Sequence, residues 1–360
     1  MSFYVTIFLV LFFFSFIEGQ NLERRVTTYF YFLFCFIFFV LSFIRWETGT
    51  DWKSYYDYFL NFKLFSSDDA PFEWGFTLLV KTVAFFSNSY TVLLFICGFI
   101  LFTFQSVSIN KISPYPIISL WFLWSIQFAN ILFVRQWIAV AILIYSVTFI
   151  QKRRFIPFLL LVILASSFHI SSLIFLAAWK IYNLEISRKK MIIILLTSVG
   201  FSVIFAKLIE ILSGGLGGVI QARLDTYLSS EYNSEENEKL GIVSIIIKGF
   251  ANKFLILLCS FCLYGKIIKR YPEFKSYLNL YWFGAVVYFT TISISLVFVR
   301  FSYVFDFFQI ILVPYIFKVI DNNLIKTLAF IIFFAYLFLR MWQLLNGPYM
   351  EEFIPFKIIL

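Results

Sequence analysis

Arginines next to apolar runs are the first residues in this chain whose type and position could do chemistry. Arg135 stands between two apolar runs, Arg300 lies between two others, and Arg45 ends a further one. A guanidinium carries a rigid fork of donors that matches phosphate oxygens. These three side chains are therefore candidate anion ligands, and Arg223, in a polar segment, is a fourth. For Arg135, snorkelling of the side chain to a membrane interface is the simpler alternative.

The candidates for moving a proton are two acids and a histidine. His169 is the only histidine, and four serines lie within three positions of it. It could donate to an anion or transfer a proton near neutral pH, although a lone histidine is more often a packing residue. Asp51 follows Gly49, and Glu73 begins the next apolar run. Either carboxylate could orient or deprotonate a hydroxyl, unless Asp51 is only a solvated loop acid and Glu73 a helix N-terminal acid.

Aromatic rings near Asp51 are suited to stacking on a sugar. These rings belong to Trp52, Tyr55 and Tyr56. No Gly-rich phosphate loop or metal-ligand cluster is present in the sequence, so we expect neither a metal nor a cofactor. Cys259 and Cys262 form a Cys-x-x-Cys motif inside an apolar run. No Asp or His lies beside it, which argues against a redox or metal role.

The composition places these residues in a membrane protein. Of 360 residues, 61% are hydrophobic and 14% charged, whereas a soluble domain carries about 25% charged residues. Runs such as Val26–Ile44 and Met191–Leu212 reach the roughly 17 to 20 apolar residues of a spanning helix. A transmembrane β-barrel would instead show short alternating segments. We therefore expect an all-α, polytopic transmembrane helical bundle of about 10 to 12 helices, forming a single integral membrane domain over residues 1–360.

The net charge of +9 comes from short basic clusters between the apolar runs, which indicates topology rather than nucleic-acid binding. The clusters expected in the cytoplasm are Arg24–Arg25, Lys152–Arg154, Arg188–Lys190, Lys266–Arg270 with Lys275, and Lys318 with Lys326. Residues 45–75 and 213–242 are richer in acids and are expected to be outer loops. The predicted later spans are Val243–Gly265, Leu278–Val297, Tyr303–Val319 and Ile325–Trp342.

The two ends of the chain are expected to differ. Met1–Ile17 is apolar from the start and lacks a basic leader, so it is predicted to be a first membrane helix rather than a signal peptide. The tail Asn346–Leu360 is predicted to be external, with Pro348 and Pro355 preventing further helix.

The middle of the chain contains one apolar run more than the expected orientation allows as membrane crossings. An outer loop at Glu73 and a basic cluster at Lys152 require an odd number of crossings between them. Four apolar pieces are available there: Gly75–Ser87, Tyr90–Val107, Pro114–Leu132 and Trp137–Ile150. The shortest, Gly75–Ser87, is expected to lie in the interface. Residues Phe155–Trp179 lie between two basic clusters, which predicts a re-entrant pair turning near Ser166–His169, where a functional site is expected.

Several short motifs follow one another along the chain, each occurring once. They are Arg45…Gly49-Thr50-Asp51 with Tyr55-Tyr56, Phe72-Glu73-Trp74-Gly75-Phe76, Arg135-Gln136…Ala139, Ala165…Phe168-His169-Ile170-Ser171-Ser172 after Lys152-Arg153-Arg154, Arg300 with Tyr303, and Ile354-Pro355-Phe356-Lys357. In this order and spacing they resemble the EpsG family, a branch of the Wzy-type polysaccharide polymerases of bacterial O-antigen and capsule pathways. The resemblance covers most of the chain.

The resemblance implies a GT-C-like fold and a glycosyltransferase in the bacterial inner membrane. The enzyme would transfer a glycan from undecaprenyl diphosphate onto an undecaprenyl-diphosphate-linked repeat unit at the periplasmic face, without a metal. Besides this lipid-linked oligosaccharide, its partners would be membrane lipid and a chain-length regulator of the same pathway, and no nucleic acid. The implied diphosphate ligands are Arg135, Arg300, Arg45 and Arg223. Asp51 or His169 would serve the acceptor hydroxyl, with Glu73 in support. The implied saccharide contacts are Trp52, Tyr55, Tyr56, Gln136 and Tyr303.

Three other functions are alternatives to the polymerase. A flippase or transporter of lipid-linked oligosaccharide would also need arginines, but in a longer chain with internal repeats and polar residues through the bilayer depth. A membrane O-acyltransferase of surface glycans usually surrounds its histidine with acids and bases, whereas serines surround His169. A structural subunit would not need Arg135, Arg300 and His169 at membrane boundaries.

Overall fold

The chain is an all-α, multi-pass membrane protein. The computed structural model describes all of residues 1–360 except 21, 65–69, 214–234, 293–298 and 360. Within the described residues no strand forms, and one isolated antiparallel bridge pairs Arg45 with Ile358. Six described helices are long and apolar enough to cross a membrane: Ser2–Gly19, Arg24–Ile44, Tyr90–Ile112, Ile246–Arg270, Arg300–Lys318 and Asn323–Leu345. The predicted polytopic bundle is thereby confirmed.

The helices belong to two compact units. The first unit comprises Met1–Leu176 with Val313–Leu360, and the second comprises Ala177–Leu312. The predicted single membrane domain over residues 1–360 stays a prediction.

Long apolar runs build the helices of the first unit. In chain order they are α1 (Ser2–Gly19), α2 (Arg24–Ile44), α3 (Trp52–Asn61), α4 (Trp74–Phe86), α5 (Tyr90–Ile112), α6 (Pro116–Gln127), α7 (Arg135–Gln151), α8 (Phe155–Ser166), α17 (Asn323–Leu345) and the one-turn α18 (Met350–Phe353). Aromatic rings hold α1, α6 and α17 together, with the fully buried Trp121 at 5.3 Å from Phe12 and 5.8 Å from Phe8. The predicted N-terminal helix is confirmed as α1.

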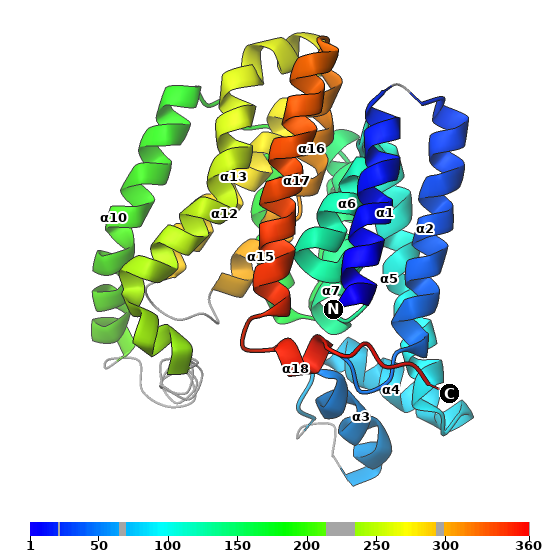
Figure 1. The fold of residues 1–360 in the computed structure, drawn as a ribbon. Helices are drawn as coiled ribbons and strands as arrows, with labels where there is room; N and C mark the ends of the chain where they lie inside the picture. The colour runs from blue at the N-terminus through cyan, green and yellow to red at the C-terminus, as the bar shows by residue number, and fades with distance from the viewer. Residues whose placement is uncertain (21, 65–69, 214–234, 293–298, 360) are drawn as a thin grey trace. The chain divides into compact units, whose positions relative to one another are not determined.

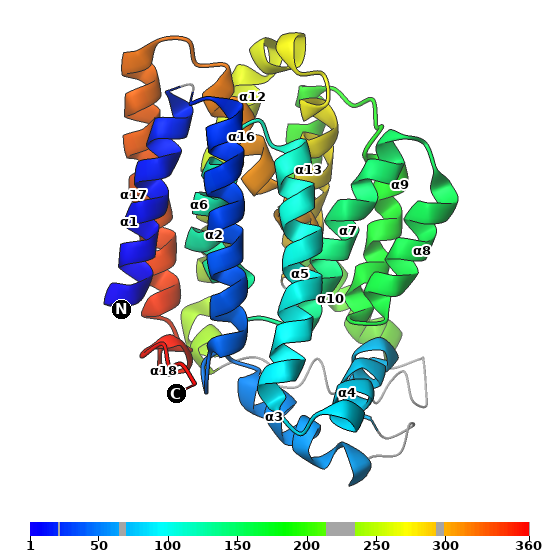
Figure 2. The same cartoon turned by 90° about the vertical axis from the view of Figure 1, so that its right-hand side faces the viewer.

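The two ends of the first unit have different chemistry. At one end, here called the basic end, charged side chains join helix termini. The buried Glu18 accepts from the backbone N–H of Ile118 at the start of α6, Arg24 donates to Asn110, and Lys326 donates to the Gly19 carbonyl. At the other end, here called the loop end, lie α3, α4 and α18 (Figures 1 and 2).

The number of crossings in the middle of the chain stays a prediction. Helix α4 is short, and α5, α6 and α7 follow it between Glu73 and Lys152; of these, α5 is long and apolar enough to cross a membrane. The apolar run Pro114–Leu132 is not one helix, however. Helix α6 ends at Gln127, and the next three residues, 128–130, have left-handed φ angles of 48°, 51° and 68°. The chain therefore makes a tight turn before Arg135 begins α7.

The predicted turn near Ser166–His169 is confirmed. Helix α8 ends at Ser166, and the chain resumes as a 3-10 helix, η3 (Ile170–Ala177), followed by α9 (Ala178–Ile181). Two short helical segments thus replace a full-length span, as the spacing of the basic clusters predicts. Their re-entrant position in a membrane stays a prediction.

The second unit contains α10 (Arg188–Ser213), α12 (Glu235–Arg270), α13 (Phe274–Thr291), η5 (Arg300–Ser302), α15 (Tyr303–Asp306) and the first turn of α16 (Gln309–Lys318), the rest of which belongs to the first unit. The predicted span Val243–Gly265 begins too late. Helix α12 already begins at Glu235, inside the predicted outer loop 213–242, of which residues 214–234 lie outside the described residues; the Glu-Glu-Asn-Glu sequence that opens α12 is typical of a helix N-terminus. The predicted span Tyr303–Val319 matches the candidate span Arg300–Lys318, although α15 and α16 are separate segments within it.

The tail is also more ordered than predicted. One helical turn, α18, fits between Pro348 and Pro355, because each proline lies just outside it. Beyond α18 the chain runs alongside the loop after α2. Trp46 N–H donates to the Lys357 carbonyl at 2.9 Å, Gly49 N–H to the Glu352 carbonyl at 2.8 Å, and Ile359 N–H to the Ile44 carbonyl at 2.8 Å.

Candidate functional site

Several predicted site residues from distant parts of the sequence form one hydrogen-bonded chain at the loop end of the first unit. It runs from Asp51 through Tyr55 and Arg135 to Glu73, and from Glu73 to the turn that carries His169. Asp51 and Tyr55 come from the start of α3, Glu73 from the residue before α4, and Arg135 from the first residue of α7.

Arg135 is the centre of this chain. Its Nε donates to the Tyr55 hydroxyl at 3.2 Å, and its Nη1 forms an ion pair with Glu73 Oε2. The guanidinium carbon lies 4.3 Å from the centroid of the Phe72 ring, with the rings of Tyr55 and Phe76 at 5.4 and 5.8 Å. These contacts fix the plane of the guanidinium. Within the part of the chain that the structure describes, its Nη2 has no hydrogen-bond partner, and the side chain stays 19% exposed.

This arrangement is suited to an anion. The N-terminus of a helix favours negative charge, because its first N–H groups point outward along the helix dipole. Arg135 adds a full positive charge at the first residue of α7. Glu73 pairs with Nη1, so an anionic ligand such as a diphosphate group would accept charge-assisted hydrogen bonds from Nη2 and meet the N-terminus of α7.

Tyr55 links Arg135 to Asp51. Its ring is 3% exposed, and its hydroxyl donates to Asp51 Oδ2 at 3.0 Å while accepting from Arg135. Burial raises the pKa of Tyr55 well above its usual value, although the positive charge of Arg135 opposes the shift. The hydroxyl is therefore protonated at neutral pH and can make both hydrogen bonds at once. Asp51 itself is exposed at the N-terminus of α3, where it can meet a substrate.

Glu73 joins Arg135 to the turn between α8 and η3. Its second carboxylate oxygen accepts from the backbone N–H of Ile170 at 3.2 Å. Beside it, Gly75 N–H donates to the Ser167 carbonyl at 2.9 Å, and a Cβ on Gly75 would lie 2.2 Å from Ser167 Oγ. Only glycine allows this approach, so the motif around Glu73 brings the start of α4 against the turn.

His169 lies in that turn, one residue before Ile170. The side chain is half-buried, and its Nδ1 lies 2.7 Å from the hydroxyl oxygen of Ser171. A hydroxyl partner on one ring nitrogen orients the imidazole. His169 thus belongs to the turn that Glu73 holds through the backbone N–H of the next residue, Ile170.

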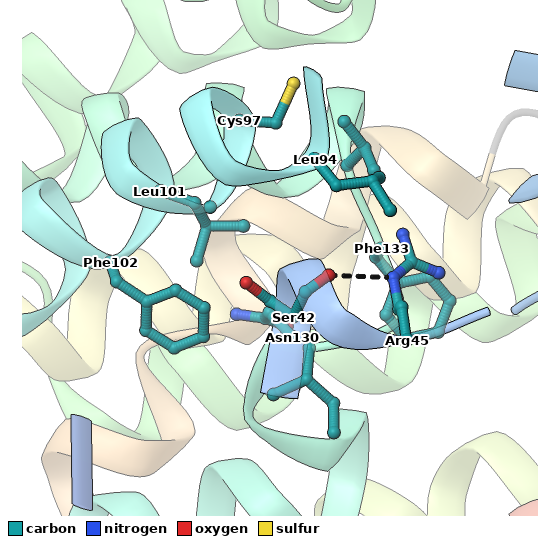
Figure 3. Close-up of a pocket in the computed structure, with 11 residues that line it drawn as sticks. Ser42, Arg45, Leu94, Cys97, Leu101, Phe102, Asn130 and Phe133 are labelled. Atoms are coloured by element: carbon teal, nitrogen blue, oxygen red, sulfur yellow. Dashed lines mark hydrogen bonds between the residues drawn. The ribbon is translucent and has the colours of Figure 1, made fainter. Parts of the chain in front are cut away.

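Arg45 has different surroundings from Arg135. It is 1% exposed, its Nε donates to the Ser42 carbonyl at 3.1 Å, and its Nη1 donates to the Thr48 carbonyl. Figure 3 shows it at a pocket that Asn130 and Phe133 also line. Gly49, with a φ of +112°, packs where a Cβ would meet the Leu132 carbonyl at 2.7 Å. These contacts shape two loops, the one that leads to Asp51 and the one that leads to Arg135.

The predicted saccharide-contacting rings pack mainly on one another. Trp52 is buried and stacks on Tyr56, with ring centroids 4.8 Å apart, and both rings contact Tyr90. Tyr56 remains partly exposed, as does Gln136 next to Arg135. Of the predicted set in the first unit, Tyr56 and Gln136 therefore keep surface for a ligand.

The remaining predicted residues lie elsewhere. Arg300 is exposed and begins η5 of the second unit, and Tyr303 begins α15. Arg223 lies outside the described residues. Among the described residues, no group of three or more His, Cys, Asp or Glu side chains could hold a metal ion.

Two features were missed at the level of sequence. The rings of Phe72 and Phe76 form the walls around Arg135, although both belong to the recognised motif. In the second unit, Lys253 of α12 pairs with Asp306 of α15. A lysine and an aspartate inside apolar runs are a signal that could have found this pair, because charges in such runs need a partner.

Comparison with known proteins gave one match. A family model described as EpsG family matches residues 28–358. Searches of curated proteins and of solved structures found no match. The expected GT-C-like architecture therefore stays a prediction.

Proposed function

The chain belongs to the EpsG family, and from this premise we propose that it is a Wzy-type polysaccharide polymerase. The family supports a glycosyltransferase-type role in polysaccharide biosynthesis. In the proposed reaction, a growing glycan on undecaprenyl diphosphate is transferred onto a repeat unit that is linked to the same carrier. We assign the enzyme to the bacterial inner membrane, with its site facing the periplasm.

The observation that carries this proposal is the environment of Arg135. The guanidinium is fixed by Tyr55 and Glu73, stands at a helix N-terminus and keeps Nη2 for a ligand among the described residues. Diphosphate is the leaving group of the reaction, so its developing charge is what a polymerase must stabilise. A preorganised arginine at a helix N-terminus supplies that stabilisation.

The acceptor chemistry falls to the two ends of the hydrogen-bonded chain. The acceptor hydroxyl oxygen forms a bond to the anomeric carbon of the donor while the bond from that carbon to the diphosphate oxygen breaks. The hydroxyl proton passes to Asp51, which accepts from Tyr55 of the Arg135 network, or to His169, whose neighbour Ile170 donates its backbone N–H to Glu73. Glu73 holds Arg135 in place and makes no contact with the reacting atoms in this scheme.

The other arginines receive separate roles. We assign Arg45 to shaping the loops before Asp51 and Arg135, because its donors are directed to backbone carbonyls. Arg300 is exposed and is assigned to a substrate diphosphate. Arg223 keeps the same assignment from sequence alone.

The charges of the first unit support the orientation. Arg24, Lys318 and Lys326 lie at the basic end, whereas Asp51 and Glu73 belong to the loop end. Helix α7 leads away from the loop end for about 25 Å, so the Lys152–Arg154 cluster that follows it is remote from that end. Basic residues mark the cytoplasmic side of inner-membrane proteins. The loop end would therefore face the periplasm.

The test is deletion of the gene in its host, with the surface glycan separated on a gel. We expect the ladder to collapse to a single repeat unit, and to return with the wild-type gene but not with Arg135→Ala, at equal amounts in the membrane. Arg340→Ala is the matched control, because Arg340 also donates to a tyrosine hydroxyl, that of Tyr336 in α17. It should restore the ladder.

Other results would refute the polymerase. If the Arg135→Ala variant still made long chains, the anion site at Arg135 would have no role in the reaction. Complete loss of surface glycan with lipid-linked units retained inside would indicate a flippase. An unchanged ladder with altered acylation would indicate an acyltransferase.

A further inference from the structure

A buried ion pair connects two helices of the second unit. Lys253, on α12, pairs through Nζ with Asp306 Oδ1, on α15. The lysine side chain is 8% exposed and the aspartate side chain 17%. Both lie in runs that are apolar enough to span a membrane. Charges at such positions are costly and persist only where they are paired or functional.

The surroundings are built to accommodate this pair. Lys253 Nζ lies 4.8 Å from the centroid of the Tyr288 ring and 5.7 Å from that of Tyr281, both on α13. Two glycines allow the helices to approach. A Cβ on Gly249 would meet the Tyr288 ring at 2.3 Å, and a Cβ on Gly284 would meet the Phe305 Cβ at 2.5 Å. Helices α12, α13 and α15 are therefore packed closely around the two charges.

Asp306 also holds the turn in front of it. Its second carboxylate oxygen accepts from the Ser302 hydroxyl at 3.1 Å, and Gln309 donates to its backbone carbonyl at 2.9 Å. Ser302 ends η5, and Arg300 begins it. One carboxylate thus joins α12 to the 3-10 turn that carries the exposed Arg300.

We propose that Lys253 and Asp306 are positioning residues for Arg300, holding the η5 turn so that Arg300 can bind the diphosphate of a lipid-linked substrate. This inference rests on the proposed function. Lys253 does not bind the substrate itself, because its charge is neutralised by Asp306 and it is shielded by Tyr288 and Tyr281. The exposed member of the cluster, Arg300, makes the contact.

The experiment measures binding of undecaprenyl diphosphate to the full chain in nanodiscs, and uses a double-mutant cycle. A charge-assisted hydrogen bond corresponds to about a tenfold change in Kd, so we expect Arg300→Gln and Asp306→Asn each to weaken binding about tenfold. Because both act through one contact, the double variant should be no weaker than either alone. Glu185→Gln, which removes the exposed ion pair with Lys275, is the control and should bind as wild type.

A second variant separates positioning from folding. Removing one partner leaves a lone buried charge and can destabilise the protein, whereas removing both does not. Lys253→Met combined with Asp306→Asn should therefore keep the wild-type thermal unfolding midpoint and still weaken binding. Wild-type Kd in this variant would overturn the proposal. Additive losses of about a hundredfold for Arg300→Gln with Asp306→Asn would overturn it too, because the two sites would then act independently.

Polymerisation is assayed on the same preparations, with lipid-linked repeat units extracted from the host that lacks the gene. A wild-type protein that binds undecaprenyl diphosphate but forms no chains would refute the proposed function alone. A wild-type protein that forms chains, with Asp306→Asn binding as tightly as wild type, would refute the positioning role alone.

Discussion

Replacing Tyr55 by phenylalanine tests the hydrogen-bonded chain at its middle. The ring is retained, so its packing on Phe72 and Phe76, and its place beside the Arg135 guanidinium, are kept. Only the hydroxyl is lost. With it go the hydrogen bond from Arg135 Nε at 3.2 Å and the hydrogen bond to Asp51 at 3.0 Å.

The magnitude follows from the two partners. A hydrogen bond to a charged group contributes about 1.5 to 3 kcal/mol where water is excluded. Tyr55 is buried and Arg135 is mostly buried, so their bond counts in full, whereas water competes for the exposed Asp51. A loss of about 1.5 to 3 kcal/mol in transition-state stabilisation lowers kcat/KM about tenfold to about a hundredfold.

The assay is chain formation by purified protein on lipid-linked repeat units. Tyr58→Phe is the matched control. Tyr58 lies on the same helix, is equally buried at 3% and packs on Phe72 at 5.1 Å, but its hydroxyl lies at 3.5 Å from Thr77 rather than on the Arg135 chain. We expect the control to keep kcat/KM within about twofold. If Tyr55→Phe did the same while Arg135→Ala was inactive, the hydroxyl would have no part in placing Arg135, and the reasoning would be wrong.

Three further predictions follow from the same end of the molecule. Gly75→Ala would place a Cβ 2.2 Å from Ser167 Oγ, so the free energy of unfolding, measured in a thermal scan, should fall by about 1 to 3 kcal/mol. Gly265→Ala is the control. A Cβ on Gly265 would have nothing within 4 Å, so this variant should not lower the free energy of unfolding. Because the pKa of Tyr55 is raised in the folded protein, its contribution to stability is complete below pH about 10 and is lost as the pH rises further. The unfolding midpoint should therefore fall less above that pH in Tyr55→Phe than in wild type, and equal slopes would contradict the raised pKa. Chain formation should survive EDTA; a loss that magnesium reverses would show that a metal takes part.

Length and charge patterns predict much of this fold, because a spanning helix needs a fixed number of apolar residues. The run Gly75–Ser87 is short for a spanning helix, and the crossing count predicts that it lies in the interface. In the structure it is α4, at the loop end. By contrast, nothing in the sequence marks the end of α6. The left-handed residues Phe128, Ala129 and Asn130 include neither glycine nor proline, so tertiary packing rather than local preference makes this turn.

The site is predictable in its members but not in its contacts. Arg135, Glu73 and His169 stand out in the sequence because charged or titratable groups beside apolar runs need a reason. That Arg135 pairs with Glu73 depends on contacts 62 positions apart, which one sequence does not encode visibly. The same limit explains Arg45, which looks like Arg135 in sequence. Its hydrogen bonds to the Ser42 and Thr48 carbonyls are local, but the loop that makes them is held by the tail, which is distant in the sequence.

The pairing of the tail with the loop after α2 has a consequence for biogenesis. Lys357 N–H donates to the Thr48 hydroxyl across 309 positions of the chain, beside the backbone hydrogen bonds of Trp46 and Gly49. Translation delivers the loop long before the segment that completes it. The loop after α2, which leads to Asp51, therefore lacks these hydrogen-bond partners until the tail around Lys357 has been synthesised. A nascent chain that stops after α17 would insert most of its helices and still lack a finished loop.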